Sequence, residues 1–147
     1  RDISDKGIHF YTNYGSSKAA ALAANAKAAV NIFWPDMDRQ IRMTVAVKKL
    51  DGKLSDAYFA TRPRKSQLGA WASAQSNELE SREKLEDQLE EFEIKFEGQD
   101  VPRPDFWGGY ELVPSYFEFW QGRPSRLHDR IIYEGTPSKW NTKRLYP

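Results

Sequence analysis

The sequence predicts a mainly β protein, built as an antiparallel β-barrel with flanking α-helices. Strand-like runs outnumber helical ones along the 147 residues. The connections between these runs are short, which favours antiparallel pairing over parallel crossovers. Aromatic residues are abundant, with five Trp, seven Tyr and eight Phe. That content fits a β-rich core, and it equally fits a ring-binding surface or a large aromatic interface.

Period-two alternation and runs of β-branched or aromatic residues predict the strands. The clearest strand covers residues 39–50, where apolar and polar side chains alternate and a half-buried antiparallel strand is expected. Its apolar face consists of Ile41, Met43, Val45 and Val47. The remaining predicted strands cover residues 8–12, 30–34, 109–113, 116–121, 130–134 and 139–145.

Helices are expected between these strands. An alanine-rich helix over residues 18–29 follows a hydroxyl N-cap in the turn at residues 15–17. Ser55 is expected to cap a short helix that stops before Pro63, because the residue preceding a proline disfavours the helical conformation. Residues 66–73 add a further short helical segment.

The longest predicted helix covers residues 81–97. Its large apolar side chains recur at spacings of three and four, which places them on one seam of an amphipathic helix. They are Leu85, Leu89, Phe92 and Phe96. The acidic residues between them are most simply a solvated face.

Composition excludes several functional classes. The formal net charge is +1, so electrostatics predict neither a nucleic-acid partner nor a membrane surface. No apolar run approaches the roughly 20 residues that span a bilayer, and no signal peptide is visible. The chain has no cysteine, which excludes disulfides and thiolate chemistry and fits a reducing cytoplasm. No metal site is predicted, because zinc would need the two histidines and distant carboxylates.

Three constellations could carry chemistry away from the C-terminus. Tyr11 and Thr12 lead through a Gly-Ser-Ser turn to Lys18, where backbone N–H groups, hydroxyls and an ammonium suit a phosphate. Alternatively, such a turn only caps its helix. Side-chain amides of Gln40 and Gln75, with Ser76, suit the imide edge of a flavin, although a glutamine alone is uninformative.

Tyr58, Arg62 and Ser66 form the next constellation. Tyr58 and Arg62 are four residues apart and share a helix face, so the guanidinium could meet a phosphate dianion beside the Ser66 hydroxyl. An equal alternative is that Tyr58 packs in the core while Arg62 caps the end of its helix.

The C-terminal segment is the most informative. In an extended chain Arg126, His128 and Arg130 share one face, close to the indole of Trp120. Three potential cations beside an aromatic ring suit an anionic, planar ligand. A solvated strand edge is the plainer alternative. The other histidine, His9, lies mid-strand and receives no role.

Taken in order along the chain, these segments resemble the pyridoxine/pyridoxamine 5'-phosphate oxidase family. The matching stretches are Phe10–Asn13, Arg39-Gln40, Tyr58-Phe59, Arg62–Trp71, Gln75-Ser76, Trp107–Gly109, Glu118–Gly122, Arg126–Arg130 and Arg144–Pro147. Each is weak alone, and the ordered set is specific.

The resemblance implies an FMN-binding split β-barrel over residues 1–147, with a C-terminal dimerisation segment at about 105–147 and its first strands lying before Arg1. It implies a cytoplasmic homodimer with FMN at the subunit interface. The family oxidises pyridoxine 5'-phosphate or pyridoxamine 5'-phosphate to pyridoxal 5'-phosphate. Oxygen reoxidises the flavin and gives hydrogen peroxide, and the amine substrate also releases ammonia.

The resemblance also implies a role for each matching residue. The phosphate end of FMN would be bound by Tyr11, Thr12, Ser17 and Lys18, and the rest of FMN by Gln40, Gln75, Ser76, Trp120 and Arg130. The substrate phosphate would be gripped by Tyr58, Arg62 and Ser66, with Arg1 adding a cation. Arg126 and His128 would be the catalytic residues, covering the substrate ring together with Leu127.

Two departures from the family pattern bear on FMN binding. Ser17 stands where the family usually has an arginine, and Arg1 stands where the family has a lysine that contacts the substrate. The strand that supplies a second arginine to the FMN phosphate in the family does not precede Arg1 in this sequence. Each lost charge-assisted bond is expected to weaken FMN binding by about 1.5–3 kcal/mol.

Two alternative functions stay open at this point. One is a related flavin oxidase that acts on another ring, as in phenazine biosynthesis. The other is a non-catalytic binder of flavin or pyridoxal phosphate, in which the phosphate turn no longer supports turnover.

Overall fold

The computed structural model describes the chain except for residues 1–2, 5–6 and 137. The chain divides into two compact units. Unit 1 consists of Arg1–His9, Asn25–Lys48 and Glu111–Pro147, and unit 2 consists of Phe10–Ala24 and Lys49–Tyr110.

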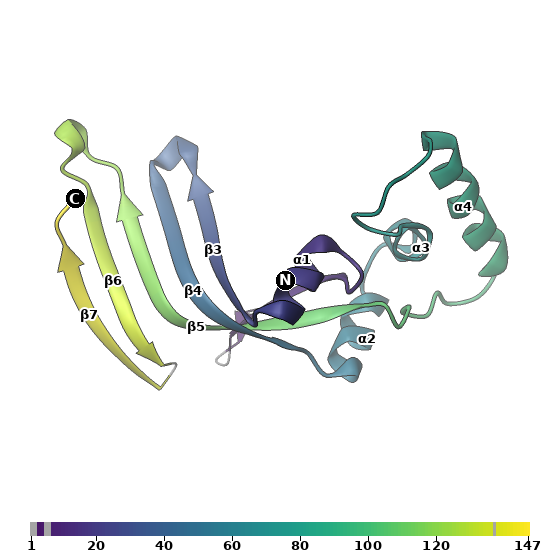
Figure 1. Ribbon diagram of the computed structural model, residues 1–147, viewed down its shortest axis with the longest axis horizontal. Helices are drawn as coiled ribbons and strands as arrows, with labels where there is room; N and C mark the ends of the chain where they lie inside the picture. Colours follow the sequence, from purple (N-terminus) through teal and green to yellow (C-terminus); the bar gives the residue numbers. More distant parts are fainter. Residues whose placement is uncertain (1–2, 5–6, 137) are drawn as a thin grey trace. The chain divides into compact units, whose positions relative to one another are not determined.

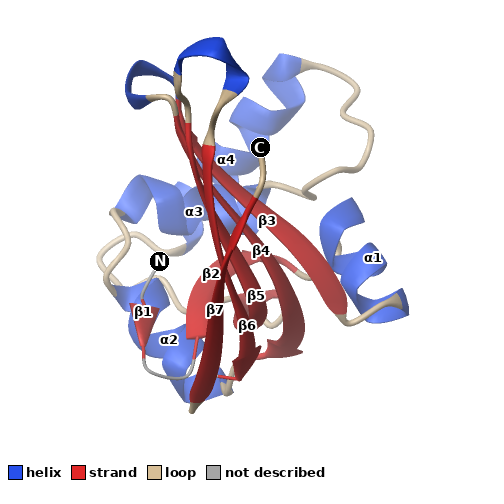
Figure 2. Cartoon of the chain, turned by 90° about the vertical axis from the view of Figure 1, so that its left-hand side faces the viewer, coloured by secondary structure: helices blue, strands red, loops and turns tan. Residues whose placement is uncertain are grey.

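Unit 1 is built on an antiparallel sheet, in which strands β3 to β7 run alongside one another (Figures 1 and 2). The strand order is β1-β2-β5-β4-β3, and β6 pairs with β5 while β7 pairs with β6. The strands are β1 (Ile3–Ser4), β2 (Gly7–Asn13), β3 (Lys27–Trp34), β4 (Arg39–Lys49), β5 (Trp107–Gln121), β6 (Asp129–Thr136) and β7 (Lys139–Leu145).

The alternation expected for residues 39–50 is confirmed in β4. Met43, Val45 and Val47 are buried, while their neighbours Thr44 and Ala46 are exposed. Because successive side chains of a strand point to opposite faces, one face of β4 belongs to the core of unit 1. The predicted last strand, 139–145, also matches β7.

Unit 2 contains the four helices. They are α1 (Ser17–Ala24), α2 (Gly52–Ala60), α3 (Arg64–Ala72) and α4 (Arg82–Lys95). Helix α3 packs against α4, whose apolar seam ends at the buried Phe96 as predicted. The core of the unit consists of Phe59, Leu68, Phe96, Val101 and Trp107. None of the helices in the described part of the chain is long and apolar enough to cross a membrane.

Two predicted boundaries are wrong in the first half of the chain. The helix expected over 18–29 ends at Ala24, and β3 already begins at Lys27. Lys27 pairs with Ala46 of β4 in the antiparallel ladder, so sheet pairing overrides the helix propensity of these alanines.

The predicted cap of α2 is also wrong. Asp51 caps the helix, because its Oδ1 accepts a hydrogen bond from the Lys53 N–H at 2.8 Å. Ser55 lies inside the helix at 1% exposure, and its hydroxyl accepts from the Gly109 N–H at 3.1 Å. The residue therefore ties α2 to β5 rather than starting a helix.

Residues 109–121 form one strand, where the sequence predicted two. Strand β5 runs unbroken through Pro114, although proline lacks the N–H that a central strand normally uses. Pairing with β6 begins only at Tyr116, which opposes Glu134. Pro114 thus stands just before the ladder that would need its missing donor.

The opening segment forms a short hairpin. Ile3 pairs with Ile8 and Ser4 pairs with Gly7 between β1 and β2.

Candidate functional site

The predicted phosphate turn of unit 2 brings Thr12 and Lys18 together, and Gln75, which was expected at the imide edge of the flavin, joins them. The Thr12 hydroxyl lies 3.2 Å from Lys18 Nζ and donates to Gln75 Oε1 at 2.9 Å. Thr12 is buried at the end of β2, whereas Lys18 and Gln75 are exposed. An ammonium, a hydroxyl and a side-chain amide thus meet beside the first turn of α1, where the helix dipole favours an anion.

Asn13 organises this turn, although it was not predicted as a site residue. Its Oδ1 accepts from the Gly15 N–H at 2.7 Å, and its Nδ2 donates to the Ser73 carbonyl at 3.2 Å. Ser16 is fully buried and caps α1 through the Ala19 N–H at 3.4 Å. An asparagine two residues before a glycine, at the start of a Gly-Ser turn, is the signal that could have identified it.

Ser17 and Ser76 stand at the margins of this group. Ser17 is the exposed first residue of α1. Ser76 is exposed and adopts a left-handed conformation, with φ 72°. Gln75 is hydrogen-bonded to Thr12. The family resemblance assigns Thr12 to the phosphate end of FMN and Gln75 to the rest of the cofactor.

A cavity of about 280 Å³ in unit 2 is lined by Arg62 and Ser66, among other residues. Arg62 Nη1 is buried and has no hydrogen-bond partner among the described residues. Its guanidinium lies 4.6 Å from the ring centroid of Trp107, and burial lowers the Arg62 pKa from its ordinary value. A desolvated cation with an unused donor is costly, so this cavity is suited to an anion.

Tyr58 lies within an aromatic stack. Its ring is 3.7 Å from that of Tyr11 with an interplanar angle of 5°, and Trp107 continues the stack. Both tyrosines are half-buried and pack against the core of unit 2. Tyr58 therefore packs against the core, as in one of the two alternatives expected. The stack also fixes the position of Tyr58, one helical turn before Arg62.

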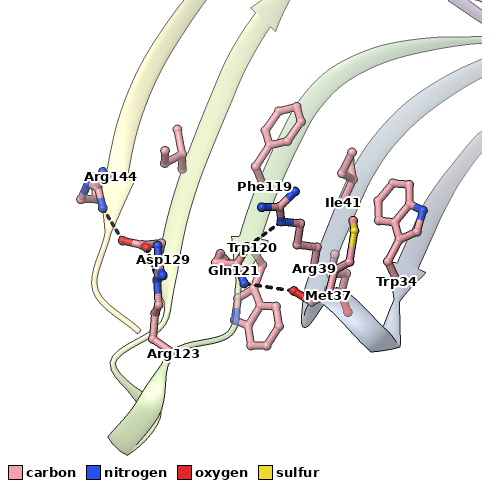
Figure 3. Close-up of a pocket in the computed structure, with 12 residues that line it drawn as sticks. Trp34, Met37, Arg39, Ile41, Phe119, Trp120, Gln121, Arg123, Asp129 and Arg144 are labelled. Atoms are coloured by element: carbon pink, nitrogen blue, oxygen red, sulfur yellow. Dashed lines mark hydrogen bonds and ion pairs between the residues drawn. The ribbon is translucent and has the colours of Figure 1, made fainter.

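In unit 1, Gln40 and Trp120 line a cavity of about 540 Å³ between β4, β5 and β6 (Figure 3). Its polar lining includes the Arg39–Gln121 hydrogen bond, at 2.7 Å, and the ion pair of Arg144 with Asp129, at 2.6 Å between nearest atoms. Apolar side chains supply the remainder of the lining, including Phe119.

Arg130 and His128 lie beside Trp120. Arg130 is the cross-strand partner of Trp120 in the β5–β6 ladder. The His128 ring is 4.8 Å from the Trp120 ring, and its Nδ1 accepts from the Arg123 N–H at 3.1 Å. In the neutral ring the proton then lies on Nε2, which leaves a donor for a ligand.

The shared face predicted for residues 126–130 is wrong. Strand β6 begins only at Asp129, and residues 124–126 form a 3₁₀ turn in which Ser125 and Arg126 have φ of 58° and 61°. Residues in the left-handed region do not continue an extended chain, so the alternation of side-chain faces is lost at this turn. Arg126 and Leu127 are exposed in this turn, Leu127 at 69%. Arg1 lies outside the described residues.

Glu118 was missed as a functional candidate, although it belongs to a matched stretch. It is 1% exposed in β5 and forms ion pairs with Arg42 and Arg130. A carboxylate between aromatic neighbours on a predicted strand, with arginines on other strands, is the signal that could have identified it.

Two family models together match most of the chain. The model described as "Pyridoxamine 5'-phosphate oxidase" matches residues 3–96, and the one described as "Pyridoxine 5'-phosphate oxidase C-terminal dimerisation region" matches residues 107–147. The chain belongs to the pyridoxine/pyridoxamine 5'-phosphate oxidase family.

Curated members of this oxidase family are close relatives. The chain is 50% identical over 147 residues to the pyridoxine/pyridoxamine 5'-phosphate oxidase of Rubrobacter xylanophilus, covering all of this chain and 68% of that protein. It is 52% identical to that of Cupriavidus taiwanensis, of which it covers 69%.

Solved structures agree with the family fold. PhzG from Burkholderia lata, in complex with tetrahydrophenazine-1-carboxylic acid, matches with a TM-score of 0.92 and 31% identity, over all of this chain and 72% of that one. A pyridoxamine 5'-phosphate oxidase-related, FMN-binding protein from Nostoc punctiforme matches with a TM-score of 0.76 and 14% identity, which bears on fold alone. The predicted mainly β, split-barrel class is confirmed.

Proposed function

We propose that this chain oxidises pyridoxine 5'-phosphate or pyridoxamine 5'-phosphate to pyridoxal 5'-phosphate, with FMN as cofactor. The observation that carries this proposal is the buried, unpartnered Nη1 of Arg62 in a cavity shared with Ser66. A phosphate dianion would supply the missing acceptor in a charge-assisted bond. The names of the curated relatives support the same substrate class.

The residues that resemble FMN ligands have suitable chemistry. Lys18, Thr12 and the N-terminus of α1 supply an ammonium, a hydroxyl and backbone N–H groups, which fits the phosphate end of FMN. We assign Tyr11, Ser17, Gln75 and Ser76 to the same cofactor. Ring-end contacts go to Gln40, Trp120 and Arg130. When bound, FMN supplies the acceptor for the hydride that leaves the substrate carbon at ring position four.

The remaining roles concern the substrate. Tyr58, Arg62 and Ser66 hold its phosphate, and Arg1 adds a cation. Arg126 and His128 orient the substrate ring, with Leu127 beside them. Nε2 of His128 can donate to a ring oxygen because Nδ1 already accepts from the Arg123 N–H. Holding the reacting carbon in line is the main contribution that such groups can make.

Oxygen is the proposed electron acceptor, with hydrogen peroxide as the product and ammonia as a further product of the amine.

We also propose a single domain over residues 1–147 that works as a homodimer through a C-terminal segment at about 105–147. The match of residues 107–147 to a C-terminal dimerisation region supports dimerisation. Exposed apolar residues of unit 1 support it too, including Trp34 at 40% and Phe119 at 41%. A cytoplasmic location stays a prediction.

The visible spectrum of the purified protein, followed by anaerobic addition of pyridoxine 5'-phosphate, tests the proposal. A yellow protein that bleaches, and regains its colour with oxygen while releasing peroxide, is the expected result. A yellow protein that stays oxidised contradicts the proposed substrate. A colourless protein that cannot be loaded with FMN contradicts the proposed cofactor and favours a non-catalytic binder.

A phenazine-type ring substrate is the second candidate. The match to PhzG, at a TM-score of 0.92, favours it. The Arg62–Ser66 cavity argues against it, because a substrate without phosphate leaves the buried Nη1 unpaired. Bleaching by a dihydrophenazine carboxylate, and not by pyridoxine 5'-phosphate, would favour this second candidate.

A further inference from the structure

A buried carboxylate lies at the centre of the charged face of unit 1. Glu118 Oε1 accepts from Arg130 Nε at 2.9 Å, and Glu118 Oε2 accepts from Arg130 Nη2 at 3.1 Å. Arg42 Nη2 lies 2.5 Å from Oε2, and the Tyr116 hydroxyl donates to the same oxygen at 3.0 Å. A carboxylate at 1% exposure persists in its charged form only with such compensation.

Strand register places this carboxylate among the proposed flavin contacts. Glu118 and Trp120 are two residues apart in β5 and share a face, and Arg130 opposes Trp120 across the ladder. On β4, Gln40 and Arg42 are likewise two residues apart. The ion pairs of Glu118 with Arg42 and Arg130 therefore join β4 and β6 on the face that carries Gln40 and Trp120.

The geometry of Arg130 shows what Glu118 does to it. A guanidinium has five N–H donors in one plane. Two of them point at Glu118, and a third, on Nη1, meets the Tyr146 carbonyl at 3.1 Å. The plane of the guanidinium is thus fixed on two sides, and two donors have no acceptor among the described residues.

The charge of the group is also fixed. Hydrogen bonding from Arg130, with further bonds from Arg42 and Tyr116, holds the Glu118 pKa at about 2 against the cost of burial. The carboxylate is therefore ionised at neutral pH. With two arginines around one carboxylate, the cluster keeps a net positive charge on this face.

We propose that Glu118 is a positioning residue for the flavin: it holds Arg130 so that the two unused N–H donors face the ring system of FMN. This inference rests on the proposed function and extends it to a residue that does not itself contact cofactor or substrate. Glu118 acts through Arg130, and Arg42 is the second cation that the same carboxylate holds.

A double-mutant cycle between Glu118 and Arg130 tests this role. The variants are Glu118→Gln, Arg130→Gln and the double variant, each stripped of FMN and titrated with FMN while the quenching of flavin fluorescence is followed. Each single change is expected to raise the FMN dissociation constant about tenfold, since one charge-assisted interaction is lost. The double variant is expected to lie within about twofold of the weaker single variant, because both changes remove one unit.

Tyr116→Phe serves as the matched control. It removes one hydrogen bond to Glu118 Oε2 and leaves both bonds to Arg130. Its FMN dissociation constant is expected to stay within about twofold of the wild-type value. Melting temperatures of the FMN-free variants separate loss of folding from loss of positioning.

Two results would overturn the inference. One is an unchanged FMN dissociation constant in Glu118→Gln while Arg130→Gln weakens binding. The other is a double variant whose loss equals the product of the two single losses, because a merely structural glutamate acts independently of Arg130. The two proposals can also fail separately. If the variants show the coupled losses of FMN affinity, but pyridoxine 5'-phosphate does not reduce the FMN-loaded wild type, the inference is supported and the oxidase proposal is contradicted.

Discussion

Arg62 in unit 2 and Arg130 in unit 1 are both half-buried, and their surroundings are opposite. Arg62 has a buried nitrogen that finds no hydrogen-bond partner in the described part of the chain, and burial lowers the pKa of Arg62. Arg130 is held by both oxygens of Glu118, and hydrogen bonding to that carboxylate raises its pKa. A cation without a carboxylate is prepared to take an anion from solution. A cation with one is prepared to present a fixed set of donors.

The largest expected effect concerns a third arginine, which is exposed and forms no ion pair with a carboxylate of the described residues. Arg126 is exposed in its 3₁₀ turn. Arg126→Ala is expected to lower kcat by about 10²–10³-fold, as for other single charge-stabilising donors, while FMN retention stays within about twofold. Steady-state kinetics and flavin release measure the two quantities. Unchanged turnover would remove Arg126 from the proposed site, and Arg126→Lys controls for charge.

Glu118→Ala and Arg62→Met should change the stability of the fold differently if the two arginines differ as described. Glu118→Ala leaves two arginines without their carboxylate and is expected to cost roughly 2–3 kcal/mol, or about 6–10 °C in Tm. Arg62→Met removes a desolvated charge and keeps the aliphatic stem, so its Tm is expected to match or exceed that of the wild type. Calorimetry of the FMN-free proteins measures both. An equal loss in the two variants would contradict the difference drawn between these cations.

The weakened phosphate turn offers a gain-of-function test. Ser17→Arg restores the arginine that the family resemblance expects, next to Lys18. FMN should bind about tenfold more tightly, the lower end for one charge-assisted bond. Ala23→Arg adds the same charge to an exposed position of α1 and is the matched control. If both variants tighten binding equally, net charge rather than the turn is responsible.

The smallest expected effect is a pH dependence. Because the folded pKa of Glu118 lies at about 2, below the ordinary 4.5, its ionised form stabilises the fold fully above about pH 4.5. This contribution is lost as the pH falls through about 2. The Tm difference between wild type and Glu118→Gln is therefore expected to be largest near neutral pH and to shrink toward about pH 2. A constant difference would show that Glu118 is not ionised in the folded protein.

Local patterns predicted the regular elements well. Alternation identified β4, which has the buried face expected, and the spacing of apolar residues identified α4, whose seam residues are half-buried. Patterns failed where a long-range contact decided the outcome. Pairing of Lys27 with Ala46 converted a helix-forming segment into strand, and the contact of Ser55 with Gly109 is invisible in the local sequence.

The candidate site shows the same division. Thr12 and Lys18 came together as the motif suggested, and so did Arg62 with Ser66. Gln75 was expected beside Gln40 and instead hydrogen-bonds to Thr12. The turn at Arg126 broke the expected strand face, because residues 125 and 126 adopt left-handed conformations that alternation cannot show. Glu118 was missed since its partners lie on two other strands, distant in sequence.

One measurement tests the central claim that Arg62 takes the substrate phosphate. It is the anaerobic rate of flavin reduction by pyridoxine 5'-phosphate and by unphosphorylated pyridoxine, in the wild-type protein and in Arg62→Met. The wild type is predicted to prefer the phosphorylated substrate by at least about tenfold, the value of one charge-assisted bond, and Arg62→Met is predicted to lose most of that preference. The same preference in both proteins would contradict the account.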